Sequence, residues 1–155
     1  MLYVIVAHDD KGGIGSDGGI PWSSSVDMKH FRQITSDCLP GKPNALIMGS
    51  VTYGTLVKNR FGANRRIMMV GKEGYSSVRG AINDCGEMGK IFICGGQRVY
   101  EEALSMDTDV TIYSSHIRGD YGCDRFVSLP GGGEIIYEDE DMTIKMNILR
   151  YNVQA

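Results

Sequence analysis

The sequence predicts an α/β fold in which helices flank a mostly parallel central sheet. Five short apolar runs are continuous rather than alternating, which is typical of strands that are covered on both faces. Helical candidates lie between these runs, so strands and helices alternate along the chain. The tail breaks this order, because its apolar residues alternate with polar ones around an acidic turn. That pattern predicts a C-terminal antiparallel β-hairpin.

The expected elements follow one another in regular order. The parallel strands are expected at residues 2–7, 45–48, 67–70, 91–94 and 110–113. The helices are expected at residues 25–35, from 52 to 56, and at 77–85 and 97–104. The hairpin is expected from residues 134–137 and 142–151, around the acidic turn 138–141 and with one face in water. No repeat or boundary is visible, so we expect a single domain over residues 1–155.

The composition excludes several classes of partner. The chain has 155 residues, of which 42% are hydrophobic and 23% are charged, and its net charge at pH 7 is −3. This balance provides no basic field for nucleic acid or for an anionic membrane, so we expect neither as a partner. The apolar start at residues 1–7 is too short for a signal peptide or a membrane span, and it reads as a buried strand.

The cysteines and histidines do not indicate a metal site. The four cysteines contain no C-x-x-C pair and lack the spacing of a zinc site: Cys38, Cys85, Cys94 and Cys123. The three histidines lack metal-ligand spacing as well. We therefore expect free thiols in a reducing, cytoplasmic compartment and no bound metal.

The glycine-rich segment 13–18 matches the pattern G-x-G-x-x-G and follows a predicted strand. In a dinucleotide-binding site of the Rossmann type, the third glycine of this pattern opens a helix. Here Gly19, Pro21 and Trp22 continue the loop, so we reject that assignment. We expect a mobile glycine-rich loop beside a ligand site, with Trp22 anchoring its end.

Two further glycine turns connect a strand directly to a helix. At Gly95 and Gly96, the missing side chains allow a ligand to approach the backbone, and the helix N-terminus that follows attracts anions. Arg98 lies in the first turn of that helix and is suited to contact a phosphate. The turn at Gly49 has the same plan, although the hydroxyl residues after it could serve only as helix caps. A plain strand-to-helix turn is the alternative at both places, whereas two binding turns would suit a ligand with two or more phosphates.

Asp27 interrupts an apolar stripe on the first predicted helix. Met28, Phe31 and Ile34 form the rest of the stripe at helical spacing. One interpretation is a first-turn acid that complements the helix dipole. The other is a lone carboxyl group beside a pocket, where burial raises its pKa and lets it hold or relay a proton near neutral pH. The sequence offers no obvious second carboxylate or nucleophile, which suits proton donation better than hydrolysis.

The motifs together resemble the dihydrofolate reductase family in order and in spacing over residues 1–126. The matching segments are Ile14-Gly15, Ile20-Pro21-Trp22, Asp27 with Phe31 and Thr35, Ile47-Met48-Gly49 with Thr52-Tyr53, Ile93-Cys94-Gly95-Gly96 with Val99-Tyr100, and Ser115-His116-Ile117. The Pro-Trp pair, the acid five residues after Trp22 and the late Gly-Gly pair are specific in combination.

This resemblance implies a three-layer fold and the NADPH-dependent reduction of 7,8-dihydrofolate to tetrahydrofolate. It implies that Asp27 hydrogen-bonds the amino group and a ring nitrogen of the pterin and promotes protonation at N5, while hydride passes to C6. It also implies that Trp22 and Ser115 hold water and hydrogen bonds around Asp27. We therefore expect a monomeric enzyme of tetrahydrofolate biosynthesis that binds antifolates.

The resemblance carries two sets of binding residues onto this chain. The substrate set is Ile5, Val6, Ala7, Asp27, Met28, Phe31, Leu56, Arg65, Cys94 and Tyr100. The NADPH set is Ala7, Ile14, Ile20, Gly49, Ser50, Val51, Thr52, Lys72, Gly95, Gly96, Gln97, Arg98 and Val99. Arg65 is expected to hold the carboxylate tail of the folate in a bidentate pair, with Arg66 as the rival.

Three departures from the family pattern bear on these expectations. Ser50 stands where a basic residue usually meets the cofactor phosphates, so the preference for NADPH over NADH depends on Lys72 and Arg98. Gln97 replaces a third glycine. Cys123 lies near the place where an Asp often supports the mobile loop, which predicts different loop ordering.

Two alternatives remain open. One is a related reductase that acts on another pterin or on a pyrimidine. The other, from a different class, is a non-catalytic protein that binds a pterin or a nucleotide.

Overall fold

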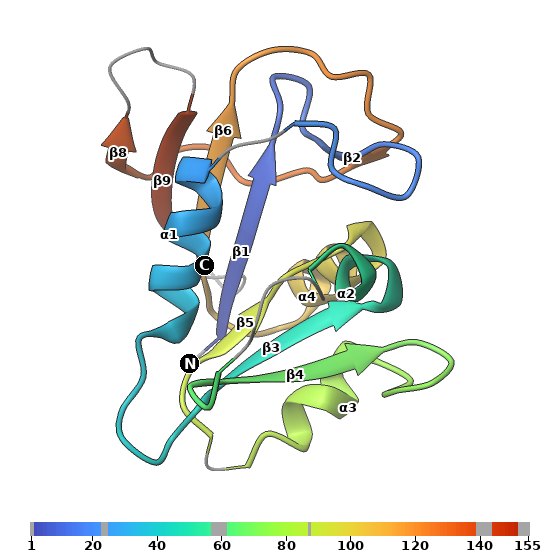
Figure 1. Ribbon diagram of the computed structural model, residues 1–155, viewed down its shortest axis with the longest axis vertical. Helices are drawn as coiled ribbons and strands as arrows, with labels where there is room; N and C mark the ends of the chain where they lie inside the picture. Colours follow the sequence, from blue (N-terminus) through green and yellow to red (C-terminus); the bar gives the residue numbers. More distant parts are fainter. Residues whose placement is uncertain (1, 23–24, 57–61, 87, 139–143, 152–155) are drawn as a thin grey trace.

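The computed structural model describes residues 2–22, 25–56, 62–86, 88–138 and 144–151 (Figure 1). Within these residues a seven-stranded sheet runs through the molecule in the order β4-β3-β5-β1-β6-β9-β8. Its strands are β1 (Leu2–His8), β3 (Asn44–Gly49), β4 (Arg65–Val70), β5 (Ile91–Ile93), β6 (Val110–Ile117), β8 (Glu134–Glu138) and β9 (Ile144–Tyr151). The first five strands of this order are parallel, and β9 and β8 are antiparallel additions at one edge. The predicted fold class is therefore confirmed.

A second, two-stranded sheet lies beyond the carboxyl ends of β1 and β6 (Figure 1). It pairs β2 (Gly13–Gly15) with β7 (Arg125–Phe126) in antiparallel fashion. The glycine-rich segment thus forms a short strand and opens no helix, which agrees with the rejection of a Rossmann site. The acidic turn predicted at 138–141 lies, apart from Glu138, outside the described residues.

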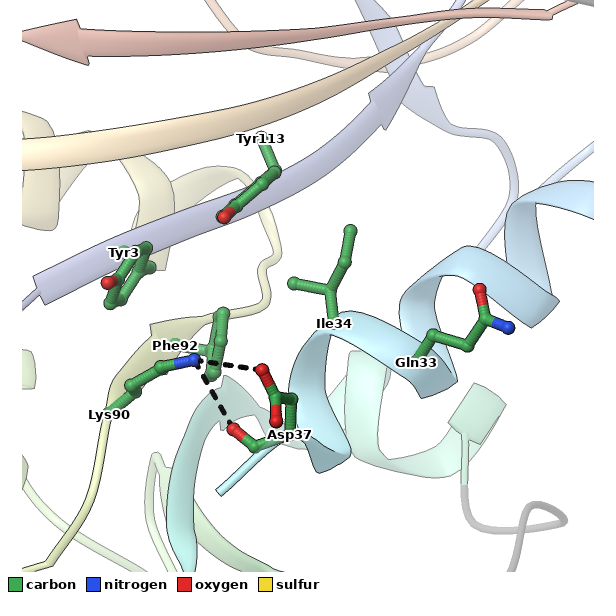
Figure 2. A pocket seen from close by; sticks show the side chains of 7 residues that line it. All are labelled: Tyr3, Gln33, Ile34, Asp37, Lys90, Phe92 and Tyr113. Carbon is green, nitrogen blue, oxygen red and sulfur yellow. Dashed lines mark hydrogen bonds and ion pairs between the residues drawn. The ribbon is translucent and has the colours of Figure 1, made fainter. Parts of the chain in front are cut away.

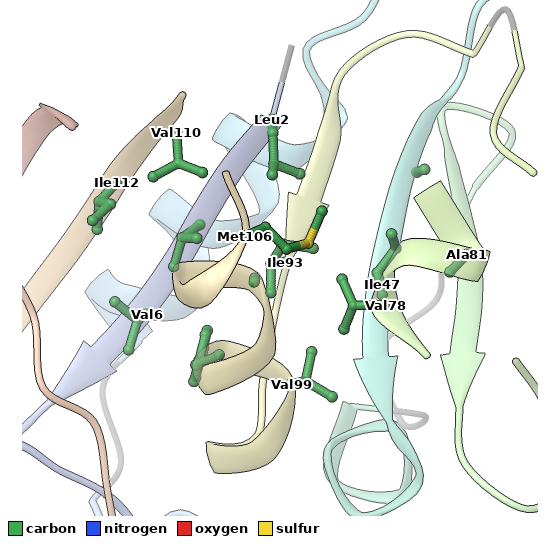
Figure 3. Close-up of a cluster of buried hydrophobic side chains, with 14 of the residues drawn as sticks. Leu2, Val6, Ile47, Val78, Ala81, Ile93, Val99, Met106, Val110 and Ile112 are labelled. Carbon is green, nitrogen blue, oxygen red and sulfur yellow. The ribbon is translucent and has the colours of Figure 1, made fainter. Parts of the chain in front are cut away.

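The helices divide between the two faces of the large sheet. They are α1 (Ser25–Ser36), α2 (Ser50–Leu56), α3 (Val78–Asn83) and α4 (Gln97–Ser105). Side chains of α3 and α4 pack on one face in a cluster that includes Val4, Ile47 and Ile93 (Figure 3). Because side chains alternate along a strand, their neighbours Ile5, Leu46 and Phe92 face the opposite side, where α1 and the end of α2 pack.

The core explains why the apolar runs are continuous. Ile47 and Ile93 are fully buried from the α3 and α4 side, and Leu46 is fully buried from the α1 side. Burial of one such side chain contributes about 1.5–3 kcal/mol relative to exposure. Polar substitutions on either face of these strands would therefore weaken the packing of the helices that cover that face.

The element boundaries differ from the predictions where polar residues end an apolar run. Strand β6 continues to Ile117, because Ser114 and His116 pair with β1 although neither is apolar. Helix α2 begins at Ser50 and not at residue 52, and α3 covers only Val78–Asn83, capped by the Ser77 hydroxyl, which accepts from Gly80 N at 3.0 Å. Within the described residues, no helix is long and apolar enough to span a membrane.

Candidate active site

Asp27 lies in the first turn of α1, on the side of the helix that faces the sheet. Burial raises the pKa of its carboxyl group, while a hydrogen bond from the Ser115 hydroxyl and the nearby His30 act in the opposite direction. The same Ser115 lies opposite Ala7 in the β1–β6 ladder, so the sheet fixes its place. This environment favours a carboxyl group that takes up a proton more readily than an exposed acid does.

An apolar wall continues from Asp27 along α1 toward α2. Met28 and Phe31 of α1 pack in one cluster with Ile5, Leu56 and Cys94. These are the residues expected to contact the pterin and the benzoyl group, and the fold brings them together. By contrast, the side chain of Val6 is buried on the α3 and α4 face of the sheet, so only its backbone is available to the Asp27 side.

Tyr100 connects the two glycine turns with the Asp27 side of β1. Its hydroxyl donates to the Ile5 carbonyl oxygen at 2.7 Å, and its ring lies close to Cys94 and Asp27. A Cβ atom on Gly95 would lie 3.0 Å from this ring, so glycine is required there by packing as well as by its φ of +113°.

The two glycine turns lie side by side at the carboxyl ends of β3 and β5. Gly49 N donates to Gly95 O at 2.8 Å, and a Cβ atom on Gly96 would lie 3.5 Å from the Thr52 hydroxyl. Gly96 is the N-cap of α4 and offers no side-chain cap to the helix, so the first N–H groups of α4 remain available to a ligand. The N-termini of α2 and α4 therefore meet at one place (Figure 1).

The remaining residues of the predicted NADPH set lie around this pair of turns or near the small sheet. Ser50, Val51, Lys72 and Arg98 are exposed, and Lys72 follows the end of β4. Gln97 is half-buried, while Val99 belongs to the core. Ile14 in β2 packs against the core from the loop side, and Ile20 is 47% exposed.

The two candidate arginines at the start of β4 point to opposite faces of the sheet. Arg65 Nη1 donates to the Thr35 hydroxyl of α1 at 3.3 Å, and Arg65 also lies near Cys94. Arg66 instead lies near Tyr75 and Cys85, and Cys85 belongs to the α3 and α4 side. Arg65 is therefore the member of the pair that shares a face with Asp27.

A separate hollow of about 210 Å³ lies near the other end of α1 (Figure 2). It is bordered by a row of three rings, Tyr3, Phe92 and Tyr113, and by the exposed ion pair between Lys90 and Asp37. It contains neither Asp27 nor either glycine turn, so it does not belong to the candidate active site.

Comparison with known proteins decides the family. The family model for dihydrofolate reductase matches residues 1–129. The dihydrofolate reductase of Schistosoma mansoni is 32% identical over 151 residues, covering 81% of this chain and 76% of the relative. The enzyme of the same name from Aedes albopictus is 27% identical over 159 residues, covering 90% of this chain and 86% of the relative. This chain belongs to the dihydrofolate reductase family.

The fold agrees with this assignment. Dihydrofolate reductase from Enterococcus faecalis, solved in complex with NADP(H) and RAB-propyl, superimposes with a TM-score of 0.68. The match covers 98% of this chain and 95% of the other at 24% identity. The prediction of an NADPH-dependent oxidoreductase that reduces dihydrofolate is confirmed at the level of the family.

Several loop residues were missed by the sequence analysis. Asp124 N donates to Gly15 O at 2.9 Å, and the Asp124 carboxylate accepts from Asp17 N at 3.0 Å. An acid therefore does contact the glycine-rich loop, one position after Cys123, while the expectation of different loop ordering stays a prediction. The signal was an acidic residue in a loop, which the chain has in many places.

The second missed residue is Asp9, at the end of β1. Its side chain is buried and only 1% of it is exposed, although it carries a carboxylate. Four donors surround it, from Lys11, Gly13, Tyr121 and Cys123. A carboxylate directly after a buried strand was visible in the sequence, but two of its four partners, Tyr121 and Cys123, lie more than 100 residues away along the chain.

Proposed function

We propose that this chain reduces 7,8-dihydrofolate with NADPH at the site between α1 and the sheet, acting as a monomer. The observation that carries the proposal is the position of Asp27. It is a half-buried carboxyl group with a raised pKa, next to the apolar wall of Met28, Phe31 and Leu56. A flat ring lying on this wall would present its polar edge to the carboxyl group.

Residues of this chain would promote the protonation of the pterin. Asp27 would accept hydrogen bonds from the pterin amino group and a ring nitrogen, and its raised pKa supports protonation at N5. The Ser115 hydroxyl would hold the carboxyl group in position, because it already donates to it. Trp22 packs against Ile117 at the end of β6, together with Val26 at the start of α1, and would limit access of water from the loop side.

The residues around the glycine turns fit the predicted cofactor. A pyrophosphate needs backbone N–H groups and room beside the chain, and the uncapped α4 N-terminus beside Gly49 and Gly95 provides both. NADPH, when bound there, would supply the hydride for pterin C6. Arg98 and Lys72 are the exposed cations suited to its phosphates, since Ser50 carries no charge.

Arg65 would hold the glutamate tail of the substrate. It lies on the Asp27 face at the far end of the wall, beside Thr35 and Cys94. A guanidinium group can bind a carboxylate through two parallel hydrogen bonds, which suits the tail of a folate.

The test is the loss of nicotinamide absorbance with purified protein, dihydrofolate and NADPH, run beside NADH. Consumption that depends on dihydrofolate supports the proposal, and the ratio of the two cofactors measures what Arg98 and Lys72 contribute. No consumption, in protein that binds an antifolate, would favour a non-catalytic binding protein. Consumption only with another pterin or a pyrimidine would favour a related reductase.

A further inference from the structure

Asp9 forms the centre of a connection between two segments that are distant along the chain. Its Oδ1 accepts from Lys11 N at 2.9 Å and from Gly13 N at 2.8 Å. Its Oδ2 accepts from Tyr121 N at 3.1 Å and from the Cys123 thiol at 3.6 Å. The carboxylate therefore holds the end of β1, the base of the glycine-rich loop and the segment 119–124 together.

The packing around this carboxylate leaves little freedom. A Cβ atom on Gly13 would lie 2.5 Å from Cys123 Cβ and 2.9 Å from Asp9 Oδ1, so no side chain fits there. Burial would raise the pKa of Asp9, but the amides of Tyr121, Gly13 and Lys11 and the Cys123 thiol lower it, and the net direction is downward. A charged carboxylate is thus the form that this environment retains.

The connection continues from Asp9 to the end of the loop through Tyr121. The Tyr121 ring meets the Trp22 ring edge-on, with 5.4 Å between the ring centroids. Trp22 in turn packs against Ile117 at the end of β6, where Val26 of α1, the neighbour of Asp27, also packs. A chain of contacts therefore runs from Asp9 through the Tyr121 backbone and ring to Trp22, at the edge of the candidate active site.

The second attachment of the loop is of a different kind. Asp17 N donates to the Asp124 carboxylate near the loop tip, and both residues are exposed. An exposed hydrogen bond competes with water, whereas the bond from Gly13 N to Asp9 is buried and the other three bonds to Asp9 are part-buried. The loop is consequently fixed at its base by a buried charge and held at its tip by an exposed contact.

We propose that Asp9 is a positioning residue that sets the orientation of Trp22 through Tyr121 and thereby prepares the loop for hydride transfer. This inference rests on the proposed function of the Asp27 site for its kinetic part only. Asp9 does not contact the apolar wall beside Asp27. We therefore expect it to affect the rate of hydride transfer and not the binding of the substrate tail.

The test uses Asp9→Asn, with Asp10→Asn as the matched control. Asp10 is the exposed neighbour, and its carboxylate bonds His116 and the backbone of Gly119, whereas Asp9 bonds Lys11, Gly13, Tyr121 and Cys123. Asn at position 9 keeps one acceptor oxygen, so its amide nitrogen must face either the Lys11 and Gly13 amides or the Tyr121 amide and the Cys123 thiol, and one of the two attachments is lost. Tyr121→Ala is a second variant that removes the ring and leaves the carboxylate intact.

Two readouts separate positioning from general stability. Trp22 is the single tryptophan of the chain, so tryptophan emission reports its surroundings without any substrate. We expect Asp9→Asn and Tyr121→Ala to shift this emission in the same direction, and Asp10→Asn to leave it unchanged. In single-turnover experiments, we expect both variants to slow hydride transfer by roughly tenfold or more, with a much smaller change in the KM for dihydrofolate.

The outcomes are distinct. Unchanged emission and unchanged hydride transfer in folded Asp9→Asn and Tyr121→Ala would overturn the proposal. If Asp9→Asn does not fold, Tyr121→Ala decides alone, because its side chain is 38% exposed and its loss creates no large core cavity. If the parent protein shows no turnover, the proposed function fails, but the emission of the ligand-free variants still tests the positioning role.

Discussion

Two aspartates near the loops, the half-buried Asp27 and the buried Asp9, have pKa values that are shifted in opposite directions. At Asp27 burial is the largest influence and raises the pKa, although the Ser115 hydroxyl and the nearby His30 act to lower it. Asp9 is at least as inaccessible, yet four donors converge on it and its pKa is lowered. The comparison teaches that hydrogen bonds to a carboxylate can outweigh the effect of burial on its pKa, as they do at Asp9 and do not at Asp27. One region is arranged to exchange a proton, and the other to hold two segments together.

The largest effect is expected in Asp27→Asn, which should lose most of its turnover if Asp27 supplies the proton. We expect kcat near neutral pH to fall by roughly 10²-fold or more, because a positioned acid contributes about 10²–10⁴-fold. In the parent enzyme the rate should decline as pH rises through the raised pKa of Asp27, since the protonated carboxyl group is then lost. The measurement is a pH profile of hydride transfer for both proteins. An identical inflection in Asp27→Asn would assign the proton to another group.

The next effect concerns stability, and here the two acids should have opposite signs. The pKa of folded Asp9 lies below its ordinary value of 3.8, so its contribution is present above pH 3.8 and is lost as pH falls through the lowered pKa. Asp9→Asn should therefore be less stable at pH 7 by about 2 kcal/mol, and the difference should shrink in acid.

Asp27 behaves in the reverse way in the same measurement. Its folded pKa is raised above 3.8, so the parent protein loses stability as pH rises from 3.8 through the raised value. Asp27→Asn should be as stable as the parent or more stable at pH 7. Urea unfolding at several pH values measures both variants. A loss of stability at pH 7 in Asp27→Asn similar to that in Asp9→Asn would remove the contrast.

A smaller effect is expected on the KM for dihydrofolate, which reports which side of the sheet binds the substrate tail. Arg65→Ala should raise the KM for dihydrofolate about tenfold, which corresponds to the loss of roughly 1.4 kcal/mol of binding. Arg66→Ala, on the other face of the sheet, should change it little. A pterin without the glutamate tail serves as the reference substrate. Equal effects of the two arginine variants on both substrates would indicate a folding defect and not a lost contact.

The smallest effect is on thiol reactivity. Burial raises the pKa of Cys94 far above its usual range, so this thiol should stay unreactive toward a disulfide reagent in the native protein at neutral pH. Burial and then the Asp9 charge raise the pKa of Cys123. Cys123 should therefore react several-fold faster in Asp9→Asn than in the parent, as followed by mass spectrometry of labelled peptides. An unchanged Cys123 rate would argue against a charged Asp9.

Local sequence pattern was sufficient for most of the fold. The continuous apolar runs predicted the parallel strands because both of their faces are buried, as Leu46 and Ile47 show on neighbouring positions. The pattern failed at the end of β6, where Ser115 and His116 continue the ladder. Backbone pairing with β1 holds this segment in the sheet and thereby places the Ser115 hydroxyl beside Asp27. Hydrophobicity does not encode this pairing.

The site was predictable to the extent that its residues carry local motifs. The two glycine turns and the acid on the apolar stripe of α1 were visible, and the structure brings each set together. The choice of Arg65 over Arg66 required the register of β4, since one residue of shift exchanges the two faces. The role of Asp9 required contacts across more than 100 residues, which a single sequence does not reveal.

The central place of β1 in the sheet has a consequence for biosynthesis. Its two neighbours, β5 and β6, begin at residues 91 and 110. At synthesis rates of about 5–20 residues per second, β1 waits roughly 5–20 s for its second partner to be made. During that interval an uncharged stretch, Leu2 to Ala7, lacks its full set of strand partners, although α1, which covers one of its faces, has already been made. An unpaired apolar edge of this kind is a template for incorrect strand pairing until its partners are made.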